Sequence, residues 1–150
     1  MGQWYNGITA VSKTVNRGSI PCWPANINTN MFSILVLTAL MFKHFLADFV
    51  FQTSWMTRDK AYYGKSGGLW HAGFHGFLTF CFLLIFKIPL FFCLLLGVFD
   101  SFLHYHIDYV KSNWIRKNSP TPNSQAYWTV HGIDQFLHFL TYVVIVVLLQ

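Results

Sequence analysis

Glutamate is absent from this sequence, and charged residues of any kind are scarce. Asp, Lys and Arg together make up 10% of the 150 residues, whereas an ordinary soluble domain carries about 25% charged residues. With 54% hydrophobic residues, the composition excludes a disordered chain and argues against a water-soluble globule. A single domain is the expectation at this length.

Cysteine and familiar catalytic motifs are also sparse. Three cysteines, Cys22, Cys81 and Cys93, make an odd count without CxxC spacing, so neither a disulfide framework nor a thiolate metal site is expected. The absence of a Walker loop, an HExxH motif and a DxxD motif argues against an NTPase, a gluzincin-type protease and a prenyl-phosphate enzyme. The net charge of +5 comes from dispersed basic residues, which favours anionic lipid headgroups over nucleic acid as a partner.

Four long apolar segments fill most of the chain. Each is close to the roughly 20 residues that cross a bilayer as a helix, and they span residues 31–51, 69–86, 88–107 and 130–149. Their polar residues do not alternate as in a strand, and a helix in lipid satisfies its own backbone hydrogen bonds. The expected fold is all-α, an integral membrane four-helix bundle over residues 31–150. Residues 1–30 are expected to form a polar tail, either disordered or a start-site extension.

The connections between the expected helices differ in length. Residues 87–89 leave almost no loop between the second and third helices, and Pro89 suits the first turn of a helix, so a tight antiparallel hairpin is expected there. Residues 53–68 and 111–129 are longer and polar. They are expected to be surface loops with short interfacial helices.

Basic residues predict the orientation of the bundle. The loops after the first and third helices hold six Lys or Arg, whereas the opposite side holds Lys87 and, in the tail, Lys13 and Arg17. The positive-inside rule therefore predicts that both long loops face the cytoplasm and both termini face outward, in the bacterial inner membrane. An aromatic belt is expected at the cytoplasmic edge, formed by Trp55, Trp70, Tyr109, Trp114, Tyr127 and Trp128.

Histidine and aspartate recur inside all four apolar segments. They are spaced i, i+4, which puts the members of each series on one helical face: His44 and Asp48; His71 and His75; Asp100, His104 and Asp108; Asp134 and His138. The depth of each side chain in the membrane is estimated at about 1.5 Å per residue from the aromatic belt. By this estimate His44, His104 and His138 lie roughly 15 Å deep, and Asp48, His75, Asp108 and Asp134 lie roughly 8–10 Å deep. All four helices thus bring polar side chains to the same half of the membrane.

An aspartate at bilayer depth is costly unless it is paired or bound to a metal ion. Imidazole and carboxylate together suit one or two divalent ions of Zn, Mn or Fe. The predicted ligands are His44, Asp48, His75, His104, Asp108, Asp134 and His138. Asp48, Asp108 and Asp134 are also the candidate catalytic bases. His71, Asp100 and Gln52 are expected just outside this set, with Asp100 orienting His104 and Gln52 bonding to Asp48.

Four segments also carry a resemblance to a known family: HFLADFVFQTSWM (44–56), HAGFHGFLTF (71–80), FDSFLHYHIDYVK (99–111) and DQFLHFLTY (134–142). In order and spacing they resemble small bacterial and phage-encoded membrane proteins catalogued as a domain of unknown function. The likeness covers about residues 31–149, and the HxxxD…HxxxH…DxxxHxxxD…DxxxH series is specific as a set. The chain is also similar in style to small proteins described as membrane-bound metal-dependent hydrolases.

The first functional hypothesis is a metal-dependent hydrolase that acts on a lipid-linked or membrane-proximal ester or phosphoester. Its expected partners are the lipid bilayer, a lipid-like substrate and further copies of the chain. The alternatives are an ion or proton pathway and a non-catalytic phage protein that binds a host membrane partner. The outer half of the bundle, with LLIFKIPLFF and YVVIVVLL, is almost wholly apolar, which favours a one-sided site over a through-pore.

Overall fold

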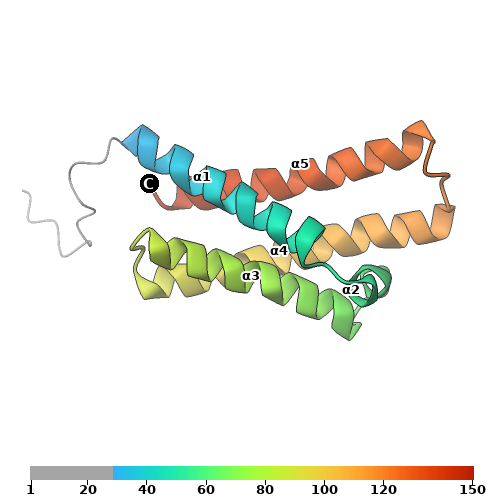
Figure 1. Cartoon of the computed structure of the whole chain (residues 1–150), viewed down its shortest axis with the longest axis horizontal. Coiled ribbons are helices and arrows are strands. Elements are labelled where there is room, and N and C mark those ends of the chain that lie inside the picture. The colour runs from blue at the N-terminus through green and yellow to red at the C-terminus, as the bar shows by residue number, and fades with distance from the viewer. Residues whose placement is uncertain (1–28) are drawn as a thin grey trace, which may run out of the picture.

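The computed structural model describes residues 29–150, so the predicted tail lies outside the described residues except for its last two positions. Within this range the chain is helical (Figure 1). In order, the elements are α1 (Thr29–Phe45), the short π-helix η1 (Leu46–Val50), α2 (Ser54–Asp59), α3 (Ser66–Ile85), α4 (Leu90–Asn118) and α5 (Gln125–Leu148). The all-α prediction is confirmed, and α2 is the short helix expected between the first two spans.

Four helical stretches are long and apolar enough to cross a membrane: Met31–Val50, Ser66–Ile85, Leu90–Asn118 and Gln125–Leu148. Successive long helices run antiparallel, so that the start of α1 and the end of α5 lie at the same end of the bundle (Figure 1). Large apolar side chains such as Ile85, Phe91 and Val98 are 68–73% exposed, which suits helices that face lipid. This is the architecture of a multi-pass membrane protein.

The predicted tight hairpin joins α3 to α4. Lys87 adopts a left-handed conformation in the turn, with φ 59°, and Pro89 is the residue immediately before α4 rather than in its first turn. Along the hairpin, Gly76 and Gly97 face each other. A Cβ built on Gly76 would lie 2.3 Å from the carbonyl oxygen of Gly97, so the absence of a side chain is what allows the two backbones to approach this closely.

The loop predicted over residues 111–129 is much shorter in the structure, so this prediction is wrong. α4 continues to Asn118 and α5 begins at Gln125, which leaves a connection of residues 119–124. Ser119 ends α4 in a left-handed conformation with φ 43°, and the Ser124 hydroxyl caps α5 by accepting a hydrogen bond from the Tyr127 N–H. The apolar run in the sequence marks the thickness of the lipid rather than the length of the helix, because a helix can continue into water.

The interior of the bundle divides into two halves. The apolar half lies toward the end that holds the start of α1 and the end of α5, and consists of Val36, Leu40, Leu83, Ile88, Cys93, Leu96, Tyr142, Ile145, Val146 and Leu149. The polar half lies toward α2, and its buried polar side chains include Lys43, His44, Asp48, Lys60, His71, His75, Thr79, Asp100, His104, Asp108, Asp134 and His138. The expected gathering of polar residues in one half of the membrane is therefore present.

Candidate metal centre

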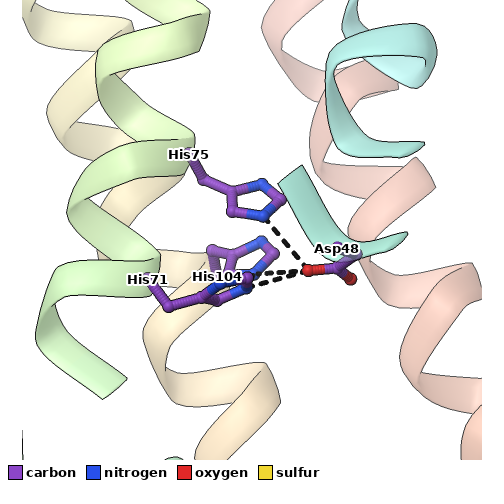
Figure 2. A group of neighbouring side chains, drawn as sticks. All are labelled: Asp48, His71, His75 and His104. Carbon is purple, nitrogen blue, oxygen red and sulfur yellow. Dashed lines mark hydrogen bonds and ion pairs between the residues drawn. The ribbon is translucent and has the colours of Figure 1, made fainter. Parts of the chain in front are cut away.

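Asp48 lies where the first span widens into the π-helix η1. The N–H of Phe51 donates to the carbonyl oxygen of Leu46 at 2.9 Å, a five-residue spacing that differs from the regular helix expected over residues 31–51. Single π-helical turns of this kind are frequent at functional sites. Only 8% of Asp48 is exposed, and its carboxylate points toward α3 and α4 (Figure 2).

Three histidines surround one oxygen of Asp48 (Figure 2). Its Oδ1 lies 2.8 Å from Nε2 of His71, 3.2 Å from Nε2 of His75 and 3.9 Å from Nε2 of His104. The Nε2 atoms of His71 and His104 are 3.0 Å apart. The ligand atoms of a tetrahedral zinc ion, with bonds of about 2.0–2.1 Å, lie about 3.3 Å from one another. The spacings in this first group therefore suit ligands that share one ion.

Two further groups share residues with the first. The second group is His44, His104 and His138, and the third is Asp108, Asp134 and His138; within each group the ligand atoms lie within 4.8 Å of one another. His104 links the first group to the second, and His138 links the second to the third. The three groups therefore form one continuous cluster from all four membrane-spanning stretches, with enough ligands for one ion or two.

Several buried polar atoms of the cluster residues make no hydrogen bond, although ion pairs with Lys60 and Lys111 reach the two oxygens of Asp108. The atoms without a hydrogen bond are Nδ1 of His71 and of His104, both carboxylate oxygens of Asp108, Oδ1 of Asp134 and Nε2 of His138. A buried polar atom without a hydrogen bond is costly and uncommon in folded proteins. The atoms of the third group converge, so a cation between them would satisfy all three residues at once.

Two buried lysines and the partly buried Lys111 face the four aspartates of the polar half. Each lies close to one carboxylate: Lys43 is 2.5 Å from Asp100, Lys60 is 2.8 Å from Asp108, and Lys111 is 3.0 Å from Asp134. With neutral histidines, one negative charge remains in excess. A buried net charge is unfavourable unless it is compensated, so a bound cation or a proton on one of the histidines would offset this charge.

All seven predicted ligands occur in these three groups. His71, which the sequence suggested as a residue just outside the ligand set, joins the first group through its Nε2 atom. The cluster thus offers five imidazoles and three carboxylates. That these residues bind metal stays a prediction.

Asp100 acts on the cluster by a different route from the one expected. The sequence suggested that it orients His104 from the preceding turn. Instead, its carboxylate accepts hydrogen bonds from the hydroxyl of Thr79 at 2.6 Å and from Nζ of Lys43. Lys43 in turn lies 3.4 Å from Nδ1 of His75, so Asp100 and Lys43 together position that histidine.

The side chains of Lys60 and Lys111 point into the bundle. From the sequence, both were expected to lie in surface loops and to mark the cytoplasmic side. Lys60 is 5% exposed and donates to Oε1 of Gln52 while pairing with Asp108. Gln52, expected as a partner of Asp48, therefore contacts the cluster through Lys60. Lys111 follows Asp108 at i, i+3, and this spacing is the one local signal that could have identified it.

His44 has partners on both ring nitrogens. Its Nδ1 lies 2.9 Å from the hydroxyl of Tyr142, and its Nε2 lies 3.2 Å from Asp48 Oδ2 and 3.2 Å from Gln135 Oε1. Neither Tyr142 nor Gln135 was predicted from the sequence as a site residue. Tyr142 follows His138 by four residues and so continues the i, i+4 series on α5, which was the available signal.

A serine pattern lies near the start of α3. Residues 64–68 read GKSGG, which fits the letters G-x-S-x-G. In that motif the serine sits on a sharp turn from a strand to a helix, whereas Ser66 follows the turn of residues 60–65, with helix α2 rather than a strand before it, and is the first residue of α3. The pattern does not describe a nucleophilic serine here.

The fold and the site define a multi-pass helical membrane protein whose buried histidines and aspartates could bind metal. Residues 36–150 match the model of the family DUF3307, described as a protein of unknown function, and the chain belongs to this family. The comparisons with curated proteins and with solved structures gave no match. The expected family of unknown function is thus confirmed. Because its description carries no activity, function has to follow from the site.

Proposed function

We propose that this protein is a metal-dependent hydrolase of the membrane that acts on a lipid-linked or membrane-proximal ester or phosphoester. The observation that carries the proposal is the cluster of five histidines and three aspartates in which several buried polar atoms make no hydrogen bond. A mixed nitrogen and oxygen ligand set suits one or two ions of Zn, Mn or Fe.

The cluster contains the groups that such a hydrolysis needs. A bound ion would activate a water molecule as the nucleophile, and two ions would hold both the attacking and the leaving oxygens. One of Asp48, Asp108 and Asp134 would accept the proton of the attacking water. Lys60 and Lys111 lie beside these carboxylates and would oppose negative charge that develops on the reacting group.

We place this site on the cytoplasmic side of the bacterial inner membrane, with both termini outward. Because Lys60 and Lys111 turn inward, the orientation depends on the exposed cations. Among the described residues these are Arg58, Lys65, Arg116 and Lys117 at the end of the bundle that holds α2, and Lys87 in the hairpin at the other end; Lys13 and Arg17 lie outside the described residues. The positive-inside rule still favours a cytoplasmic location for the polar half.

An ion or proton pathway is less well supported. Conduction requires polar groups through the full thickness of the membrane. Among the described residues, the polar chain runs from His75 through Lys43 to Asp100 and Thr79 and then meets the apolar half. A site closed on one side suits hydrolysis better than transport.

Elemental analysis of the detergent-purified protein tests metal binding. One or two ions per chain are expected in the wild type, and less than one in His75→Ala and Asp108→Ala. His106→Ala is the matched control, because this ring contacts Tyr63 and the carbonyl oxygen of Phe102 instead, and it should keep the wild-type content. Metal well below one ion per chain in the wild type would overturn the proposal.

Turnover of acyl-chain esters and phosphoesters with a chromogenic leaving group tests the reaction. Activity should disappear when a chelator removes the metal and return with Zn or Mn. His75→Ala should be inactive, whereas His131→Ala, whose ring packs against Tyr127 and Trp128, should be active. Hydrolysis that survives complete metal removal would contradict the assigned chemistry.

A further inference from the structure

A groove between α4 and α5 connects the lipid-facing surface with the polar half. Its volume is about 370 Å³, near the lower end of the roughly 300–1,000 Å³ that ligand sites occupy. Its apolar wall includes Val110, Trp114, Ile133 and Leu137, and its polar side chains are His106, Lys111 and Asp134. Lys111 and Asp134 are also members of the polar cluster, so the groove borders the candidate metal centre at these two residues, while its accessible lining is almost wholly apolar.

The apolar wall of the groove is open to the bilayer. Val110 is 65% exposed, Ile133 55% and Leu137 39%, and all three belong to membrane-spanning stretches. Trp114 belongs to the aromatic belt, which marks the level of the headgroups. The groove therefore lies where acyl chains meet headgroups, and an acyl chain is the apolar material available to fill it.

Lys111 is the point at which the charged cluster reaches this groove. Its side chain is 14% exposed, compared with 4% for Lys60 and at most 7% for the aspartates of the polar half. Behind it, Asp134 and Asp108 lie 3.0 Å and 3.4 Å from its Nζ atom. A group that enters from the bilayer would therefore meet Lys111 first and the third metal group next.

The charge balance of the cluster favours an anionic headgroup. Three lysines and four aspartates leave one net negative charge, and one divalent ion changes this to one net positive charge. If Asp108 and Asp134 ligated that ion, the ammonium group of Lys111 would be released toward the groove. A phosphate there would accept charge-assisted hydrogen bonds.

We propose that the groove between α4 and α5 admits an anionic membrane lipid sideways from the bilayer, with an acyl chain along Val110, Ile133 and Leu137 and the phosphate at Lys111. This inference rests on the proposed function, because it names the substrate class of the same metal centre. It also accounts for how a substrate reaches side chains that are almost fully buried.

Quenching of Trp114 fluorescence by brominated lipids measures occupancy of the groove. The full chain is reconstituted with zinc in phosphatidylcholine vesicles that contain either brominated phosphatidic acid or brominated phosphatidylcholine. Subtracting the signal of Trp114→Phe isolates the contribution of Trp114. Brominated phosphatidic acid should bind about fivefold more tightly, the effect expected of one basic residue at an anionic headgroup. Lys111→Gln should remove this preference.

Two valines provide matched variants for the groove. Val110→Phe fills it and should reduce quenching by both lipids, whereas Val147→Phe, at a position 62% exposed on the outer part of α5, should leave quenching unchanged. Equal quenching of the wild type by both lipids would overturn the inference. The zinc content of the same samples distinguishes the lipid groove from the metal centre. If zinc is bound but neither lipid is preferred, the proposal of a lipid groove is overturned and that of a metal centre is not. A preference that depends on Lys111 without bound zinc supports the groove and overturns the metal centre.

Discussion

The two halves of the bundle bury opposite kinds of side chain on the same four helices. In the apolar half, Leu40, Leu83 and Ile145 are fully buried and require only close packing. In the polar half, histidines, aspartates and lysines are equally buried, and lipid offers them no hydrogen bonds, so each must find partners inside the bundle. A single deletion in the polar half therefore leaves a second group without its partner, whereas a deletion in the apolar half leaves only a space.

The two halves meet at Lys43 and Tyr142. The Nζ atom of Lys43 lies 4.7 Å from the centre of the Tyr142 ring, and the hydroxyl of Tyr142 lies 2.9 Å from Nδ1 of His44. The ring of Tyr142 belongs to the apolar half, and its hydroxyl serves the polar half. Changes at this boundary separate the two kinds of stabilisation most directly.

The largest effect is expected when the buried ion pair at the boundary loses one member. Lys43→Met leaves the carboxylate of Asp100 without the ammonium group that lies 2.5 Å away, and about 3–5 kcal/mol of unfolding free energy should be lost. The double variant Lys43→Met/Asp100→Leu replaces both charges by apolar groups and should recover most of that loss. Unfolding in detergent, followed by circular dichroism, measures both. A double variant no more stable than Lys43→Met alone would contradict this expectation.

Stabilisation by metal is the next largest effect and distinguishes the polar half from the apolar half. At a zinc concentration a thousand times Kd, a ligand that binds only the folded state adds about 4 kcal/mol. His104→Ala removes the residue shared by the first and second groups and should abolish the zinc-dependent rise in unfolding temperature. His106→Ala, on the same helix but outside these groups, should retain it. A full zinc effect in His104→Ala would mean that the ion binds elsewhere.

The course of the four long helices could be predicted from the sequence because lipid permits few alternatives for an apolar segment. The prediction was wrong where lipid no longer constrains the chain. The polar end of α4 continues as helix to Asn118, since its end depends on local capping rather than on membrane thickness. The π-helical turn at Leu46–Val50 contains neither Pro nor Gly, and no local pattern in the sequence distinguishes it from regular helix.

The candidate ligands could be identified because each helix has only one face that can be hidden from lipid. The i, i+4 spacing of His and Asp is therefore informative without knowledge of the packing. The lysines could not be identified in this way, because a lysine near the end of an apolar segment ordinarily extends to the membrane surface. Lys60 turns inward toward Asp108, which lies on another helix, and such partners are brought together only by folding.

A smaller effect is expected at the glycine contact that brings the histidines of α3 near those of α4. A methyl group on Gly76 would overlap the backbone of Gly97, whereas one on Gly73 would meet nothing within 4 Å. Gly76→Ala should therefore cost about 1–3 kcal/mol and weaken zinc binding, because His75 would move away from His104. Gly73→Ala should be neutral or slightly stabilising. Equal effects of the two substitutions would contradict the role of this contact in setting the polar half.

The smallest effect is expected when one hydroxyl is removed and the packing is kept. If Nε2 of His44 ligates a metal ion, its Nδ1–H donates to the oxygen of Tyr142, and this contact fixes the tautomer and the ring orientation. Tyr142→Phe retains the ring in the apolar half but leaves Nδ1 of His44 without its partner, so the metal-free protein should lose about 1 kcal/mol of unfolding free energy, while zinc affinity should fall about tenfold. Tyr127→Phe, on the same helix but away from the cluster, is the control for zinc titrations. An unchanged zinc affinity in Tyr142→Phe would show that this hydroxyl does not orient a metal-binding His44.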